Sequence, residues 1–181
     1  MHNPNVINLK SEVLFREAED DFIYFNKFKN AIKKLEEAIE LTPSHHKSYS
    51  LLGDVLFIQG KVEKALKNYK EADKYINNSK IIASIAMCLE AKGEYKEALK
   101  HCDKAFLFIN EDNCQLYLSL YELKTTILLK LRRYEEAKKF IESAKNNLSI
   151  EDLMNFKTQR ELINSKLRLK EKMEKISLRA L

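Results

Sequence analysis

Glycine and proline are scarce in this 181-residue sequence, which holds only Gly53, Gly60, Gly93, Pro4 and Pro43. A β-sandwich or β-barrel needs many tight turns, and these two residues supply the backbone conformations that such turns require. Their scarcity therefore favours helices joined by short loops. The composition, 45% hydrophobic and 33% charged, is typical of a folded protein and argues against general disorder.

Cysteine is also sparse, and long apolar runs are missing. Cys88, Cys102 and Cys114 are odd in number and widely spaced, which disfavours a disulfide framework and fits a reducing compartment. We expect them to pack as small apolar side chains.

Without an apolar run of about 18 residues or a basic start followed by an apolar stretch, we expect no membrane span and no signal peptide. The cytoplasm is the expected location.

The sequence lacks the motifs of common catalytic and metal sites. Its glycines are too far apart for a phosphate-binding loop, and it contains neither CxxC nor HExxH. On a helix, the neighbours His45 and His46 would point about 100° apart, so we expect them in solvent at a repeat junction rather than on a metal. His101–Cys102 is an isolated pair with no sign of a positioned base. We therefore expect no enzyme activity, no catalytic residues and no cofactor or metal.

Positive charge is concentrated at the end of the chain. The formal net charge is +5. Residues 152–181 contain eight lysines or arginines and four acids, so they carry four of those five charges. The preceding residues are nearly neutral. The basic tail, residues 152–181, is therefore a candidate interaction segment.

A 33–34-residue pattern repeats along the chain. It is clearest in YSLLGDVLFIQGKVEKALKNYKEA, residues 49–72. Earlier and later units place small or apolar residues in the same register, with about five residues inserted before the last unit. The four matching triplets are Ala31, Leu35 and Ala38; Ala65, Tyr69 and Ala72; Ala98, Cys102 and Ala105; and Ala137, Ile141 and Ala144.

The repeated residue types have a physical reason. Small side chains allow two antiparallel helices to approach closely, and the residue four places on lies on the same helix face. Gly60 and Gly93 stand where the first helix of a pair should end in a left-handed residue. One helix pair cannot bury its apolar face alone, so such pairs stack in arrays.

These residues resemble the tetratricopeptide-repeat (TPR) family, most closely in the unit with Leu52, Gly53, Ala65, Tyr69 and Ala72. The resemblance implies an all-α, right-handed α-α superhelical solenoid with about four TPR-like helix pairs. A long C-terminal capping helix, residues 150–178, would follow. We expect one domain over 1–181, with repeats at 12–45, 46–79, 79–112 and 118–151.

The expected helices follow from these repeats. They span 11–25, 28–41, 45–59, 62–76, 80–92, 95–109, 113–131, 134–147 and 150–178. We expect Ser79, Asp112 and Ser149 to be N-caps. In the last helix, Leu153, Phe156, Ile163 and Leu167 should cover the final repeat, while Leu162, Leu169 and Ile176 recur every seven residues with Met173 beside them.

The resemblance also implies where a ligand would bind. In TPR proteins, the first helix of each pair lines a concave groove for an extended peptide or a partner helix. The predicted groove residues are Arg16, Asp20, Tyr24, Lys47, Ser50, Asp54, Phe57, Lys80, Met87, Glu90, Glu122, Thr126 and Lys130. Positions matching the carboxylate clamp of TPR co-chaperones read Arg16, Asp20, Leu51, Lys80 and Ser84, and Asp20 would repel a carboxylate. We therefore argue against that specialisation.

The leading functional hypothesis is a non-catalytic adaptor or scaffold that binds another protein or peptide in this groove. A secretion-chaperone-like TPR protein holding a partner is one alternative. A nucleic-acid-associated protein that uses the basic C-terminal helix is another, although interspersed acids and scarce aromatics disfavour nucleic acid. Self-association through the C-terminal helix is left open.

Overall fold

The computed structural model describes residues 4–109, 114–144 and 157–179, and within those ranges the chain forms nine helices and no strand. Its contacts cluster into two compact units, residues 1–94 and 95–181, which we call unit 1 and unit 2. The single domain over 1–181 stays a prediction. The helices of unit 1 are α1 (Pro4–Ile23), α2 (Phe28–Leu41), α3 (His46–Ile58), α4 (Val62–Asp73) and α5 (Ser79–Ala91). Those of unit 2 are α6 (Tyr95–Leu107), α7 (Cys114–Lys130), α8 (Tyr134–Ala144) and α10 (Lys157–Arg179).

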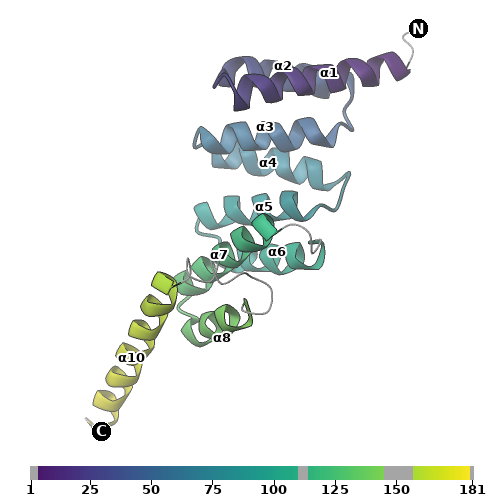
Figure 1. Ribbon diagram of the computed structural model, residues 1–181. Coiled ribbons are helices and arrows are strands. Elements are labelled where there is room, and N and C mark those ends of the chain that lie inside the picture. Colours follow the sequence, from purple (N-terminus) through teal and green to yellow (C-terminus); the bar gives the residue numbers. More distant parts are fainter. Residues whose placement is uncertain (1–3, 110–113, 145–156, 180–181) are drawn as a thin grey trace. The chain divides into compact units, whose positions relative to one another are not determined.

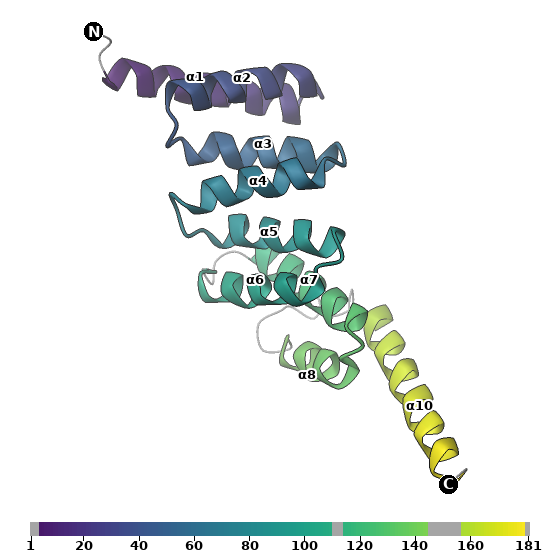
Figure 2. The ribbon, with the colours of Figure 1, turned by 180° about the vertical axis from the view of Figure 1, so that it is seen from behind.

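Unit 1 is a stack of antiparallel helix pairs. The helices α1 and α2 pack together, as do α3 and α4, and each pair lies on the next through α2 with α3 and α4 with α5. Both ribbon views show this layered order (Figures 1 and 2). The first helix of each pair, α1, α3 and α5, therefore lies on one side of the stack.

The repeated small residues are all buried. Ala31, Ala65, Ala98 and Ala137 have no exposed surface, as expected where two helices approach closely. The residues four places on, Leu35, Tyr69, Cys102 and Ile141, are buried too. Equivalent positions thus have equivalent environments, and the predicted repeat register is confirmed.

Each first helix is followed by a residue in the left-handed backbone conformation. These residues are Asn26 (φ 51°), Gly60 (φ 73°), Gly93 (φ 79°) and Arg132 (φ 58°). After α3, the amide of Lys61 donates to the Leu56 carbonyl at 2.9 Å, and the amide of Gly60 donates to Phe57 at 2.9 Å. This is a Schellman motif, and the same pattern of bonds follows α5 and α7. The predicted roles of Gly60 and Gly93 are confirmed, and Arg132 takes the same conformation without being glycine.

Several predicted helix limits were wrong. The first helix begins at Pro4, not near residue 11, because proline is well tolerated in a first helical turn. The N-cap of α5 is Asn78 rather than Ser79, and its side chain accepts bonds from the amides of Lys80 and Ile81. Asp112 and Ser149, with residues 150–156 of the expected last helix, lie outside the described residues.

The insertion before the last repeat lengthens a helix, in agreement with the long helix expected over 113–131. The helix α7 has 17 residues, whereas α3 and α5 have 13 each. It packs against α6 and α8, with the rings of Tyr121 and Phe140 stacked at 4.7 Å between centroids. The Lys124 ammonium lies 4.4 Å from the centre of the Phe140 ring and 2.6 Å from the Asp103 carboxylate.

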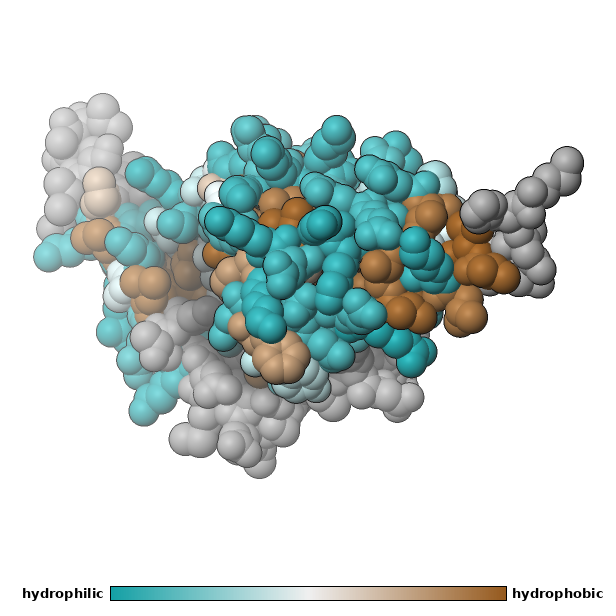
Figure 3. Space-filling model, turned by 90° about the horizontal axis from the view of Figure 1, so that it is seen from above, coloured by the Kyte–Doolittle hydropathy of each residue, from teal (hydrophilic) through white to brown (hydrophobic). Residues whose placement is uncertain are grey.

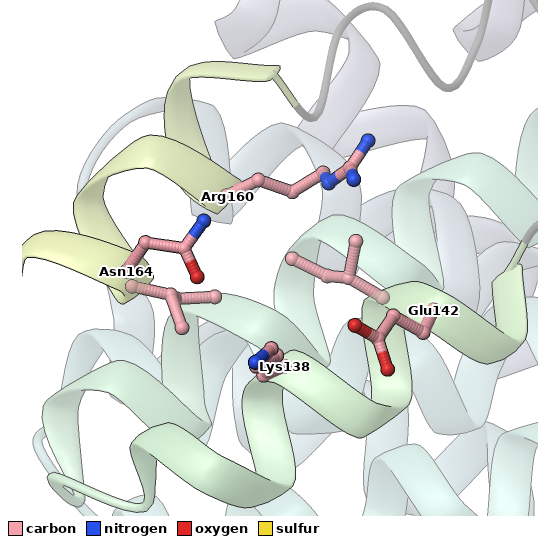
Figure 4. Close-up of a pocket in the computed structure, with 6 residues that line it drawn as sticks. Lys138, Glu142, Arg160 and Asn164 are labelled. Carbon is pink, nitrogen blue, oxygen red and sulfur yellow. The ribbon is translucent and has the colours of Figure 1, made fainter. Parts of the chain in front are cut away.

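The last helix, α10, is seated on α8. Ile163 and Leu167 of α10 are buried, in agreement with the predicted capping stripe; Leu153 and Phe156 lie outside the described residues. Figure 4 shows the small gap between the two helices, with Arg160 and Asn164 of α10 facing Lys138 and Glu142 of α8. This gap holds about 40 Å³, which is far below the size of a ligand pocket.

One end of unit 1 is partly apolar. Val6, Leu9 and Val13 are exposed on α1 at spacings that place them on one helix face. Figure 3 views the molecule from this end and shows apolar side chains gathered beside the start of α1. Among the described helices, none combines the length and the apolar character that a membrane crossing requires.

Candidate functional site

The side of unit 1 formed by α1, α3 and α5, which we call the groove face, contains two adjoining hollows. The first mixes polar and apolar groups and is lined by Phe15, Glu19, His46, Lys47, Ser50, Leu51, Asp54, Ile76, Asn78, Lys80 and Ile81. The second is mainly apolar and is lined by Phe22, Asp54, Phe57, Ile58, Tyr69, Ser84 and Met87. Asp54 belongs to both, so the mixed hollow and the apolar hollow form one continuous surface.

The apolar hollow has a fixed polar floor. The Tyr69 hydroxyl donates a hydrogen bond to Asp54 Oδ1 at 2.7 Å. Burial, reinforced by the Asp54 charge, raises the pKa of Tyr69, so the phenol stays protonated and remains a donor. Phe57, Ile58 and Met87 surround a volume of about 420 Å³. A space of that size accepts an apolar side chain of a partner.

The mixed hollow carries charges of both signs. The Lys80 ammonium lies 3.7 Å from Asp54 Oδ2, and Lys47 Nζ lies 3.2 Å from Glu12 Oε1. Burial lowers the pKa of His46, which therefore lines the hollow as a neutral ring at neutral pH. Exposed pairs of this kind are worth at most about 1 kcal/mol each, so a ligand can displace them at low cost.

His45 corrects a prediction. It is not in solvent, because its side chain is only 14% exposed. Its Nε2 lies 3.1 Å from Glu12 Oε2, and its Nδ1 lies 2.7 Å from the Ser48 hydroxyl. The hydrogen bond with His45 is the main cause that lowers the pKa of Glu12, which pairs also with Lys47.

The Glu12–His45–Ser48 chain has the residue types of a hydrolase triad, but its geometry is that of a structural joint. Ser48 has no exposed surface, so its hydroxyl cannot reach a substrate. The three residues instead connect α1 with the start of α3, where His45 is the N-cap residue. Within the described residues, no group of three or more His, Cys, Asp or Glu side chains could hold a metal ion.

The structure gathers about half of the predicted groove residues. The two hollows contain Lys47, Ser50, Asp54, Phe57, Lys80 and Met87. Arg16, Asp20, Tyr24 and Glu90 lie outside both lining sets, and Arg16 Nε instead lies 3.6 Å from Glu12 Oε1. Glu122, Thr126 and Lys130 are on α7 in unit 2. As binding residues, all thirteen stay predictions.

Sequence reasoning missed several lining residues. Phe15 and Phe22 of α1 are seven residues apart, which places them on one helix face. This spacing could have identified them as groove residues from the sequence. Ser84 of α5 was considered only as a position matching the carboxylate clamp, and it lines the apolar hollow. Tyr69 was assigned only to packing, yet its hydroxyl is part of the apolar hollow.

A third hollow lies on another side of unit 1, among α2, α3 and α4. It is lined by Glu36, Ile39, Glu40, Tyr49, Leu52, Lys67, Asn68 and Glu71. No sequence pattern pointed to it. Substitutions in this third hollow can serve as controls for substitutions in the groove face.

Comparisons with known proteins support the repeat class. The family profile described as anaphase-promoting complex, cyclosome, subunit 3 matches residues 26–105, which is less than half of the chain. The chain is 28% identical over 129 residues to a DnaJ homolog subfamily C member 7 homolog of Schizosaccharomyces pombe, an alignment that covers 64% of this chain and 27% of that protein. It is 30% identical over 97 residues to the Hsp70-Hsp90 organizing protein of Triticum aestivum, covering 48% and 17%.

A third relative is named for the repeat itself. It is a TPR repeat-containing protein of Methanocaldococcus jannaschii, 25% identical over 148 residues, with 73% of this chain and 26% of that protein covered. The chain therefore spans about a quarter or less of the length of these curated relatives.

Solved structures show the same fold. YrrB, described as a TPR protein with an unusual peptide-binding site, matches with a TM-score of 0.64 at 16% identity, covering 74% of this chain and 66% of that one. PilF of Pseudomonas aeruginosa matches with a TM-score of 0.66 at 17% identity, covering 92% and 71%. The predicted all-α helical-repeat solenoid is confirmed, and the chain is similar to tetratricopeptide-repeat proteins.

Proposed function

We propose that this chain is a non-catalytic adaptor that binds a segment of another protein across the groove face. The observation that carries the proposal is the pair of hollows that share Asp54. An apolar side chain of the partner would enter the apolar hollow, beside Phe57 and Met87. Its neighbouring polar groups would meet Lys47 and Lys80 in the mixed hollow, so that burial supplies affinity and charge supplies specificity.

The comparisons support protein binding as a class and leave the partner open. YrrB is described as having a peptide-binding site. The wheat relative is an Hsp70-Hsp90 organizing protein, but we do not extend that role to this chain. Of the clamp-matching positions, Leu51 is buried and Asp20 is acidic, so neither can hold a carboxylate.

The test is a selection followed by affinity measurements. The full chain is immobilised and used to select binders from a random-peptide display library. The affinity of each selected peptide is then measured for the wild type, for Met87→Glu and for Ile39→Glu. Met87 is 41% exposed, so an acid there should be tolerated by the fold. Ile39, a partly exposed apolar residue that lines the third hollow, is the control on another surface of unit 1.

We expect Met87→Glu to weaken binding at least about tenfold and Ile39→Glu to leave it unchanged. Equal weakening by both variants, or none by Met87→Glu, would contradict the groove proposal. A chain lacking residues 168–181 should keep its affinity, since the groove face lies in unit 1. The nucleic-acid alternative predicts a different outcome, namely oligonucleotide binding that falls steeply with added salt.

A further inference from the structure

The helix α10 has two apolar stripes with different environments. Ile163 and Leu167 are 1% and 8% exposed and belong to the side of α10 that packs on α8. Leu162, Leu169 and Met173 are 45%, 53% and 62% exposed. One stripe thus anchors the helix, while the other presents three large apolar side chains at the surface. We call the second stripe the α10 seam.

The α10 seam is narrow and has the spacing of a coiled coil. Leu162 and Leu169 are seven residues apart, and Met173 follows after four more. On a regular helix these three positions fall within about 40° of one another. They lie about 120° around the helix from Ile163 and Leu167. Seven- and four-residue spacing is that of the positions through which one helix packs along another.

Positive charge flanks the α10 seam on both sides. Lys166 and Lys172 stand three residues before and after Leu169, which places Lys166 at the edge of the stripe beside Met173 and Lys172 on the opposite side. Both are exposed, and neither forms an ion pair with another described residue. Exposed Arg168 lies on the same flank as Lys172, together with exposed Glu161, which offsets part of the positive charge there.

These charges decide what can cover the seam. A second copy of α10, parallel or antiparallel, would bring a lysine-flanked stripe against a lysine-flanked stripe, and like charges beside a helix interface are destabilising. A membrane surface requires a broad apolar face that is buried in the headgroup region, whereas this one is a narrow stripe. Glutamate and aspartate on a partner helix would complement the lysines directly.

We propose that the α10 seam is a docking site for an amphipathic helix of another protein, whose apolar stripe is flanked by acidic residues. This site is separate from the groove face, because it lies in unit 2 and uses a different mode of recognition. An adaptor with both sites could hold two partners at once.

The test uses two synthetic helical peptides as probes for the full chain. Both have about four heptads with leucine at the apolar positions, and the flanking positions are all glutamate in one and all lysine in the other. Like charges discourage each peptide from pairing with itself. Fluorescence anisotropy should show that the acidic peptide binds at least about tenfold more tightly than the basic one.

Two sets of variants locate the binding. Leu169→Ser combined with Met173→Ser should weaken the acidic peptide at least about tenfold. The control is Leu107→Ser on α6, whose side chain is 82% exposed, and it should change nothing. Lys166→Glu combined with Lys172→Glu should invert the preference in favour of the basic peptide. The matched reversal of the exposed Lys96 and Lys139 should leave the preference as it was.

Three results would overturn the proposal. One is failure to bind the acidic peptide, or equal binding of both peptides. Another is seam-dependent binding to phosphatidylserine vesicles without binding of the acidic peptide, which would indicate a membrane surface. The third is a dimer in sedimentation equilibrium that Leu169→Ser with Met173→Ser abolishes, which would mean that a second copy covers the seam.

Discussion

The ring of Tyr69 lies directly over Gly53, so closely that a β-carbon at position 53 would stand 2.6 Å from ring atom Cε1. The ring cannot easily move aside, because Tyr69 is only 3% exposed and its hydroxyl is bonded to Asp54. The glycine thus allows a large aromatic residue from α4 to pack against α3. In the next repeat the corresponding positions are Ala86 and Cys102. The glycine is replaced by a larger residue and the tyrosine by a smaller one.

This relationship predicts that Gly53→Ala is destabilising and that Tyr69→Cys relieves part of the loss. Overpacking costs up to about 3 kcal/mol and the better helix propensity of alanine returns about 1 kcal/mol, so we expect a net loss of about 2 kcal/mol. Tyr69→Cys alone should cost about 3 kcal/mol through its cavity. The double variant should be at least about 1 kcal/mol more stable than the sum of the single effects. Urea unfolding measures all three variants, and strictly additive losses would show that the two side chains do not conflict.

A second prediction concerns Arg132, which adopts a left-handed conformation (φ 58°) where two other repeats have glycine. A side chain in this conformation costs about 1 kcal/mol relative to glycine. Arg132→Gly should therefore raise the free energy of unfolding by about 1 kcal/mol. The adjacent Arg133→Gly is the control and should lower it, because Arg133 pairs with Glu136 and no positive φ is relieved there. Equal effects of the two variants in thermal melts would contradict this explanation.

The sequence was sufficient to predict the fold because the repeat rests on local geometry. A small residue recurring every 33–34 positions marks close helix contact, and Ala31, Ala65 and Ala98 have no exposed surface. Gly60 likewise marks a left-handed turn, since few other residues suit it. Arg132 is an exception, because it adopts the same left-handed conformation without being glycine. The sequence alone contained no signal of that turn.

The groove was predicted less completely, because its shape depends on contacts distant in sequence. Glu12 and His45 are 33 residues apart, and nothing in either neighbourhood indicates that they bond. Phe57 and Met87 were placed by the family pattern, whereas Tyr69 enters the apolar hollow from a second helix. Arg16 was predicted to line the groove, and the structure pairs it with Glu12 of its own helix. Helical spacing alone cannot tell whether such a side chain faces the groove or a neighbour on the same helix.

A third prediction uses the lowered pKa of Glu12, for which hydrogen bonding to His45 is the largest cause. A carboxyl group whose folded pKa lies below its unfolded value stabilises the fold above the unfolded pKa, 4.5. That stability is lost as the pH falls through the lower folded pKa. Glu12→Gln should therefore cost up to about 1 kcal/mol at neutral pH and progressively less as the pH falls below 4.5. Urea unfolding of both proteins across this range measures the difference, and a gap that does not change with pH would show that the charge is irrelevant.

The last prediction uses Cys88 in unit 1 and Cys102 in unit 2, both of which are buried and free. Desolvation is the main cause that raises the pKa of each thiol to about 12, and nearby Asp54 and Asp103 add to it. The reactive thiolate is therefore scarce in the folded state. Alkylation by iodoacetamide should occur only through unfolding, which makes each cysteine a reporter of its own unit.

Labelling at increasing urea concentrations, followed by peptide mass spectrometry, measures the opening of the two units separately. If residues 1–181 form the single domain predicted from the sequence, Cys88 and Cys102 should become reactive over the same range of urea. Neighbouring repeats stabilise one another through their interfaces, so a short array should open as a unit. Reactivity of Cys102 at clearly lower urea than Cys88 would contradict the single domain, because unit 2 would then unfold while unit 1 stayed intact.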